Sequence, residues 1–155
     1  MSESTTASRV RIDGKFFRLC QRKFHPRGTS YGPFVPNPQT GTFPSRAQIL
    51  IDFDLLQQLG ANLIRVYEVP PSWFLDLALA HDLRVLIDVP WSSNLCFLDR
   101  PDQEREAFEA VRQAARSCAG HVAVFGYSVV NELPSDIVRW HGQRRIERFL
   151  NRLAD

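Results

Sequence analysis

Residues 121–132 read His-Val-Ala-Val-Phe-Gly-Tyr-Ser-Val-Val-Asn-Glu, an apolar run that ends in an amide and a carboxylic acid. A strand buried on both faces has such a continuous apolar sequence, which is typical of parallel sheets covered by helices. In α/β barrels, the residues that carry out chemistry project from the carboxyl ends of the strands. The run therefore predicts a buried strand that presents Asn131 and Glu132 at the mouth of a barrel.

Strand and helix patterns alternate along the rest of the chain, which predicts consecutive βα units and a parallel sheet. Residues 15–20 and 23–30, split by Gln21-Arg22, predict a small hairpin that feeds the first barrel strand. The later strands are expected at residues 62–67, 83–89 and 121–130. We thus expect an α/β fold of the parallel (β/α) barrel type, made of the first four βα units, which is half of a TIM barrel.

The segments between the expected strands have helical patterns. Ser45 is a natural N-cap for a helix that ends at Gly60, and Pro70-Pro71 precedes a second helix over residues 72–81. A third helix is expected over residues 102–118, and Pro134 opens a single last helix. The apolar positions expected to share one face of the first helix are Ile49, Phe53, Leu55, Leu56 and Leu59.

Composition narrows the class of protein. The 155 residues, of which 44% are hydrophobic, suit one globular domain. A net charge of +2, from 19 basic and 17 acidic side chains, does not indicate a nucleic-acid or membrane surface, so neither partner is expected. The polar start lacks the pattern of a secretory signal, and no run approaches the roughly 20 apolar residues of a membrane span. We expect a cytoplasmic protein.

Metal and cofactor patterns are not found in the sequence. The four histidines, at positions 25, 81, 121 and 141, do not fall at metal-ligand spacing with carboxylates. The three cysteines, Cys20, Cys96 and Cys118, are far apart and odd in number, which predicts reduced thiols. Glycines are scattered and form no phosphate cradle. The sequence therefore predicts neither a metal ion nor a cofactor.

Residues 52–67, 85–88 and 125–132 resemble the first half of clan A glycoside hydrolases, in particular the β-glucanosyltransferase and family 2 type barrels. The resemblance implies that Arg65 ends strand two and that Asn131-Glu132 ends strand four, with Glu132 as general acid/base. It covers residues 15–153, so a partial glycoside-hydrolase-like barrel domain is expected over residues 15–155, after a polar tail over residues 1–14. The nucleophile, a second glutamate on strand seven of that clan, has no counterpart in the sequence.

This resemblance implies a retaining glycoside hydrolase or transglycosylase that acts on an oligo- or polysaccharide. One carboxyl group protonates the leaving oxygen, and a second, about 5–5.5 Å away, attacks the anomeric carbon. Asn131 would bind a sugar hydroxyl beside the scissile bond, and Arg65 would keep the nucleophile ionised. The alternatives are that Glu132 caps the following helix and that Arg65 forms an ion pair with Asp88.

Aromatic and polar residues that follow the strands are candidates for binding sugar, because the C–H faces of a pyranose stack on rings. The alternative for Trp91 is a plug at the top of the barrel, whereas Trp73 and Trp140 are expected to pack against the sheet. The candidate substrate-binding residues are Tyr31, Tyr67, Asp88, Trp91 and Asn94.

A complete (β/α)₈ barrel takes about 250 residues, so four units leave an open sheet with two unpaired edges. Three hypotheses follow. The chain is the front part of a longer glycosidase, which supplies the other barrel half and the nucleophile. Alternatively, it is a carbohydrate-binding half-barrel that associates with a second copy through its edge strands. A third possibility is an unrelated βα scaffolding domain.

Overall fold

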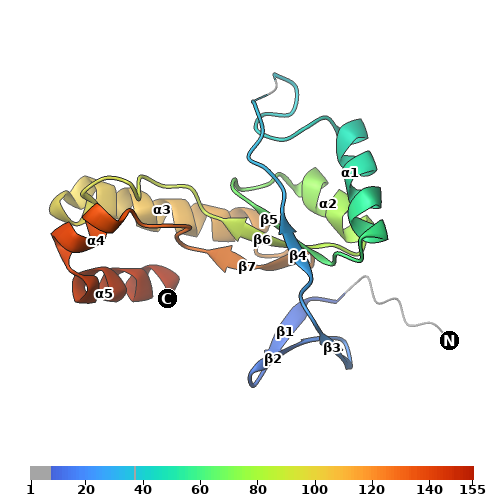
Figure 1. Ribbon diagram of the computed structural model, residues 1–155, viewed down its shortest axis with the longest axis horizontal. Helices are drawn as coiled ribbons and strands as arrows, with labels where there is room; N and C mark the ends of the chain where they lie inside the picture. Colours follow the sequence, from blue (N-terminus) through green and yellow to red (C-terminus); the bar gives the residue numbers. More distant parts are fainter. Residues whose placement is uncertain (1–7, 37) are drawn as a thin grey trace.

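The structure, a computed structural model, describes residues 8–36 and 38–155 as an α/β protein with two sheets (Figure 1). A four-stranded parallel sheet has the order β4-β5-β6-β7, and a three-stranded antiparallel sheet has the order β1-β2-β3. The parallel strands are β4 (Gly28–Ser30), β5 (Leu63–Val66), β6 (Arg84–Asp88) and β7 (Val124–Ser128). The predicted parallel sheet is confirmed.

Helices connect the parallel strands as the sequence predicts. Ser45 caps the first helix, since its hydroxyl oxygen accepts a hydrogen bond from the backbone N–H of Gln48. No helix among the described residues is long and apolar enough to cross a membrane. The connecting helices are α1 (Arg46–Gln58), α2 (Ser72–Ala80), the short 3-10 helix η2 (Phe97–Asp99) and α3 (Pro101–Cys118).

The first core lies where α1 and α2 cover the parallel sheet. Phe74 is fully buried at its centre, and its ring lies 4.6 Å from Phe43 and 5.5 Å from Phe53, measured between centroids. Strands β5 and β6 contribute alternating β-branched residues to the same cluster, because alternate side chains of a strand point to the same face of the sheet. The fully buried members from these two strands are Ile64, Val66, Val85 and Ile87.

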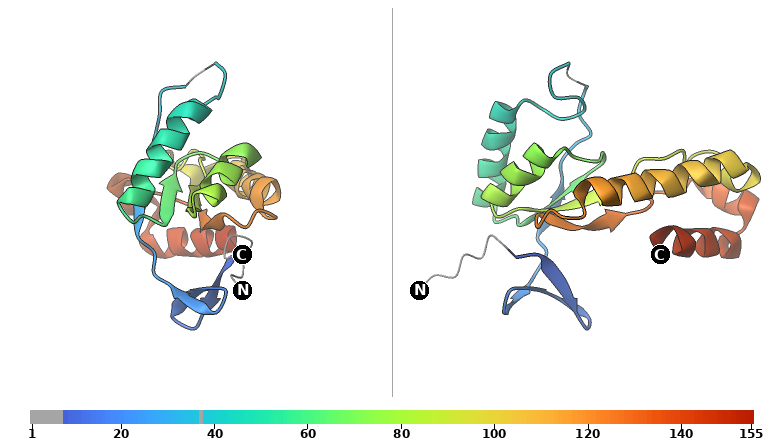
Figure 2. Two further views of the ribbon diagram at one scale, coloured as in Figure 1. Left: turned by 90° about the vertical axis from the view of Figure 1, so that its right-hand side faces the viewer. Right: turned by 180° about the vertical axis from the view of Figure 1, so that it is seen from behind.

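The second core lies beyond the sheet, where η2, α3, α4 (Ser135–His141) and α5 (Gln143–Ala154) meet (Figure 2). Its centre is Phe149, which is 2% exposed. The single last helix that the sequence predicts is wrong, because Gly142 has a φ of +81° and separates α4 from α5. A residue with a Cβ rarely adopts this backbone conformation, so glycine permits the break.

The antiparallel sheet packs against the amino-terminal end of β7, where Phe17 and Phe125 have ring centroids 4.9 Å apart. Pro26, between the third and fourth strands, splits the predicted segment 23–30 in two. The predicted tail over residues 1–14 contains a strand, although residues 1–7 lie outside the described residues. The alternation of Val10 and Ile12 with polar neighbours is typical of this strand. The strands are β1 (Val10–Asp13), β2 (Phe16–Leu19) and β3 (Arg22–Phe24).

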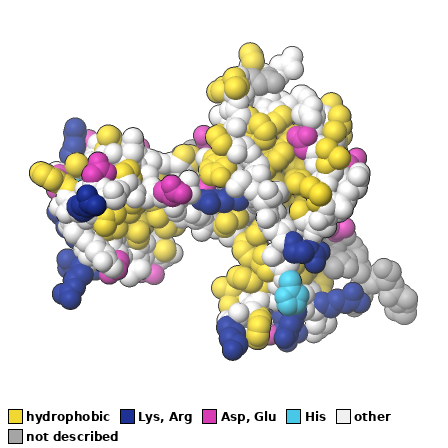
Figure 3. Space-filling view, viewed as in Figure 1, with side chains coloured by type: hydrophobic (Ala, Val, Ile, Leu, Met, Phe, Trp, Pro, Cys, Tyr) yellow, Lys and Arg dark blue, Asp and Glu magenta, His cyan; other side chains and the backbone are white. Residues whose placement is uncertain are grey.

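Helix α1 buries only part of its apolar surface. Ile49 and Phe53 are fully buried, but Leu55 is 53% exposed and Leu59 is 81% exposed, so the predicted single apolar face is wrong. With Ile51, these leucines form an exposed stripe at a spacing of four residues, and Figure 3 shows hydrophobic side chains over this part of the molecule. One face of α1 therefore lies against the sheet and another is open.

Candidate active site

Three polar side chains meet at the carboxyl ends of neighbouring parallel strands. The Arg65 guanidinium, near the end of β5, donates through Nε to Asp88 Oδ2 at 2.8 Å, and its Nη2 lies 2.6 Å from the same oxygen. Nη2 also donates to Asn131 Oδ1, beyond the end of β7. Because parallel strands bring their carboxyl ends to one edge, residues 66 positions apart in sequence come into contact.

Burial and charge distinguish the members of this network. The Asp88 side chain is 6% exposed and that of Arg65 is 33% exposed. The hydrogen bond to Asp88 raises the pKa of the Arg65 guanidinium, against the opposite effect of its own partial burial, and the charge of Glu132 adds in the same direction. Asp88 Oδ1 is buried and has no hydrogen-bond partner among the described residues. At this site, the buried Asp88 carboxylate therefore holds the positively charged Arg65 guanidinium in place.

Asn131 and Glu132 follow β7 in an irregular segment, because the strand ends at Ser128 and not at residue 130 as predicted. Both residues are exposed, and the charge of Glu132 acts on the Arg65 guanidinium. The Ser128 hydroxyl donates to the carbonyl oxygen of Val130 at 2.8 Å, which shapes this segment. Capping of the next helix by Glu132 is not observed, since the N-cap of α4 is Pro134 and no side chain caps it.

The two tyrosines that follow β4 and β5 lie in different environments. Tyr67 lies beside the site, where its ring is 5.4 Å from the Arg65 guanidinium carbon and its hydroxyl donates to Ser30 Oγ at 3.0 Å. Tyr31 is 8% exposed in the first core, and its hydroxyl donates to Asp52 Oδ2 at 2.7 Å. Burial raises the pKa of the Tyr31 phenol above its ordinary range. The structure gives Tyr31 a packing role, and its contact with sugar stays a prediction, although it lines a small cavity together with Tyr67.

Trp91 and Asn94 follow β6. The Trp91 indole N–H donates to the carbonyl oxygen of Val129 at 2.6 Å, and its ring packs edge-on against Phe97 and Phe149 in the second core. This position agrees with the alternative in which Trp91 is a plug, and it also fixes the segment that leads to Asn131. Asn94 is exposed in a turn.

The remaining tryptophans differ from each other. Trp73 packs beside the first core under the Arg46 guanidinium, as the sequence predicts. Trp140 is 71% exposed, so its expected packing against the sheet is wrong.

Cavities in the described part of the chain lie mostly away from this network. The largest, about 630 Å³, adjoins the antiparallel sheet and is lined by none of the predicted site residues. A small cavity of about 40 Å³ is lined in part by Tyr67 and Glu68. Glu68 is not among the residues predicted from the sequence, and its signal is its place directly after Tyr67 at a strand end. This cavity lies beside Tyr67, whose ring adjoins the Arg65 guanidinium.

The fold matches parts of several larger proteins of known structure. A GH2 β-galacturonidase from Eisenbergiella tayi, bound to galacturonate, superposes with a TM-score of 0.66 at 23% identity, over 94% of this chain and 26% of that one. A β-glucuronidase from Ruminococcus gnavus, in complex with D-glucuronic acid, gives a TM-score of 0.73 at 18% identity, over 93% and 23%. Gas2 gives 0.62 at 19% identity, over 83% and 33%.

These similarities establish a shared fold. No protein-family model matches the sequence, and a search of the curated proteins gives no match. The chain spans between about a quarter and a third of the length of the three structures above. It is thus an α/β chain that shares the fold of part of these larger proteins.

Proposed function

We propose that this chain forms part of the catalytic domain of a retaining glycoside hydrolase or transglycosylase, in which Glu132 is the general acid/base. The observation that carries the proposal is the convergence of Arg65, Asp88 and Asn131 at the carboxyl ends of three adjacent parallel strands. In barrel enzymes, working residues come from this end of several strands. Glu132 is next to Asn131 on the open side of the network.

The chemistry assigns a separate role to each side chain. Glu132 would protonate the leaving oxygen of the glycosidic bond and then deprotonate the attacking water or sugar hydroxyl. Asn131, held through its carbonyl oxygen by Arg65, has its amide N–H₂ free to donate to a sugar hydroxyl. The Arg65 guanidinium is permanently charged and would keep a neighbouring nucleophilic carboxylate ionised. Tyr67 and Asn94 would contact the sugar beside them.

The proposal requires a partner half that contributes the nucleophile, and both edges of the sheet offer a place for it. In the described chain, β4 and β7 each pair on one side only. Beside β7, a groove of about 550 Å³ is lined by residues that include Tyr127, Val129 and Leu153, and beside β4 the exposed stripe of α1 remains uncovered. Further βα units, from a longer chain or a second copy, would cover these surfaces and complete a barrel.

The names of the matched structures guide the choice of substrate. Two of them are named for β-linked uronides, galacturonate and glucuronate. We therefore propose a β-glycoside of an oligo- or polysaccharide as substrate, with β-uronides as the first to be tested.

The test uses the native protein that contains this chain, with wild-type sequence or Glu132→Gln. Activity is measured on aryl β-glycosides, including the β-glucuronide and β-galacturonide, with leaving groups of different acidity. Loss of the acid should lower kcat/KM, which reports the cleavage of the glycosidic bond and not the later deglycosylation, about 10²–10⁴-fold for poor leaving groups. The loss should be much smaller for a dinitrophenyl leaving group, which departs without a proton.

A matched control is Glu109→Gln, which changes an exposed glutamate on α3 that pairs with Arg112. It should leave kcat/KM unchanged for every substrate. Equal loss of activity in the two variants, or a loss in Glu132→Gln that does not depend on the leaving group, would contradict the role of Glu132 as acid/base.

A further inference from the structure

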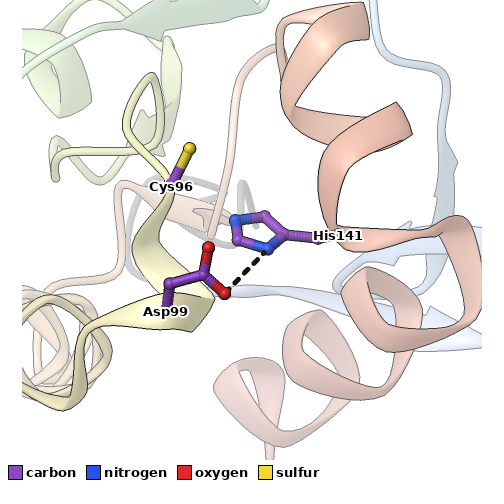
Figure 4. A group of neighbouring side chains, drawn as sticks. All are labelled: Cys96, Asp99 and His141. Carbon is purple, nitrogen blue, oxygen red and sulfur yellow. Dashed lines mark ion pairs between the residues drawn. The ribbon is translucent and has the colours of Figure 1, made fainter.

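A second group of reactive side chains lies away from the strand-end site. Cys96 immediately precedes η2, Asp99 ends it, and His141 is the last residue of α4. One ligand atom from each residue lies within 4.8 Å of the other two. Figure 4 shows the imidazole reaching from α4 toward the loop that carries the thiol and the carboxylate. A sulfur, a nitrogen and an oxygen thus converge on one small volume.

The histidine at the centre of this group is buried without a hydrogen-bond partner. The side chain of His141 is 1% exposed, and neither ring nitrogen has a hydrogen-bond partner among the described residues. Its Nδ1 lies 3.7 Å from Asp99 Oδ1, which is too far for a hydrogen bond. Leaving a buried polar group unsatisfied is costly, so this imidazole needs a partner that the surrounding side chains do not provide.

The carboxylate is already oriented by its neighbours. The Trp140 indole N–H donates to Asp99 Oδ2 at 2.5 Å, which leaves Oδ1 turned toward His141. The Arg145 guanidinium lies 3.5 Å from Oδ1, and it also donates to the carbonyl oxygen of Leu98. Ligating carboxylates in metal sites are held by such outer hydrogen bonds. Trp140 is therefore a positioning residue, and its exposed ring is explained by this bond.

We propose that Cys96, Asp99 and His141 bind a zinc-like divalent cation, with water in the fourth position. Thiolate and imidazole ligands favour Zn²⁺ over Mg²⁺ or Ca²⁺, which prefer oxygen ligands. A thiolate and a carboxylate also neutralise the charge of the ion. On binding, the Cys96 thiol gives its proton to solvent, so the affinity falls as the pH is lowered.

The geometry requires a small closure of the three side chains. Ligands about 2.0–2.3 Å from a tetrahedral ion lie roughly 3.5 Å from one another, compared with the 4.8 Å limit in this structure. Cys96 and Asp99 are exposed and can approach the buried imidazole by side-chain rotation. The bound ion would join η2 to α4 and so fix the helix that follows Glu132. This proposal departs from the metal-free protein that sequence spacing predicts, and it does not depend on the proposed glycosidase activity.

The test is cobalt substitution of the purified 155-residue chain. Titration with Co²⁺ should produce a thiolate-to-cobalt charge-transfer absorption in the near ultraviolet, saturating at one ion per chain, and Zn²⁺ should abolish it by displacement. Cys96→Ser should remove this absorption and weaken Zn²⁺ binding at least about 100-fold, because loss of even an outer-shell partner weakens binding 10- to 100-fold. Competition with a chromophoric chelator gives the affinities.

Cys20→Ser is the matched control, because Cys20 is also exposed but lies in the antiparallel hairpin. It should retain both the absorption and the affinity. Asp99→Asn, an isosteric change, should weaken Zn²⁺ binding while the thiolate absorption remains. The proposal is overturned if the wild-type chain shows no charge-transfer absorption with Co²⁺, or if the absorption survives Cys96→Ser.

Discussion

The two apolar cores of this chain differ in how completely they are enclosed. The first core, under α1 and α2, has fully buried residues from β5 and β6 at its centre. The second, between η2, α3, α4 and α5, adjoins an open groove and the unpaired edge of β7. Arg65 and Asp88 are carried by strands of the first core, whereas Asn131 and Glu132 lie on the segment that leads into the second.

The two cores therefore support different parts of the candidate site. The enclosed core holds the Arg65–Asp88 pair, and the open core adjoins the segment that carries the exposed Asn131 and Glu132. Regions with fewer buried contacts open at lower free energy. We therefore expect the second core to be the less stable region and the one that changes when the sheet is extended.

Truncation of an aromatic residue in each core should cause the largest losses of unfolding free energy. It also compares the two cores directly. Phe74→Ala removes a ring that contacts four other aromatic side chains, and it should cost about 4–5 kcal/mol of unfolding free energy. Phe149→Ala should cost nearer 3 kcal/mol, because side chains beside the open groove can relax. Urea unfolding followed by circular dichroism measures both. A larger cost for Phe149→Ala would reverse the comparison.

The Arg65–Asp88 pair should show the next largest effect. A double-mutant cycle with Arg65→Met and Asp88→Asn should give a coupling energy of about 1–3 kcal/mol, because Asp88 is buried. The coupling energy is not larger, because Arg65 is one-third exposed and solvent screens part of its attraction to Asp88. The exposed pair Arg18–Asp13, measured by the same cycle, should give less than about 1 kcal/mol. Equal coupling energies in the two cycles would contradict the claim that burial of Asp88 strengthens its hold on Arg65.

Gly142 tests the break between α4 and α5. Gly142→Ala should cost about 1–3 kcal/mol, because its φ of +81° is strained for any residue with a Cβ. Gly120→Ala is the control, since Gly120 lacks a positive φ and a Cβ there meets no atom within 4 Å. Thermal unfolding of the two variants provides the comparison, and equal melting temperatures would mean that α4 and α5 can merge without strain.

Trp140→Phe should have the smallest effect on stability. The side chain is 71% exposed, so the variant should lose no more than about 1 kcal/mol of unfolding free energy. Its indole N–H orients Asp99, however, so affinity for Zn²⁺ should fall about tenfold. Chelator competition detects this change, and an unchanged affinity would show that Trp140 does not position the carboxylate.

The sequence predicted the first region of the fold well because its signals are local. Strand runs, the Ser45 cap and the Pro70-Pro71 helix start each specify nearby backbone, and the structure places β5, β6, α1 and α2 within a residue or two of the expected bounds. The strand-end convergence of Arg65 with Asp88 also followed, because parallel strands share one carboxyl edge.

The second region depends on contacts that spacing does not reveal. The helix that the sequence extended through residue 142 has a continuous apolar pattern, and only the backbone of Gly142 shows that it breaks. His141 meets Cys96 and Asp99 from more than 40 residues away, so no local motif marks the group. Tyr31 lies in the first core because Asp52 on α1 offers its phenol a part-buried acceptor.

The most direct test of the central proposal is a titration of the ¹⁵N-labelled chain with β-linked oligosaccharides and methyl β-uronides, followed by amide chemical shifts. The account predicts concentration-dependent shifts at Tyr67, Asn131 and Glu132 that disappear in Asn131→Ala, while the first core is unaffected. Absence of shifts with every sugar, or shifts that lie elsewhere and persist in Asn131→Ala, would contradict a carbohydrate site at the strand ends.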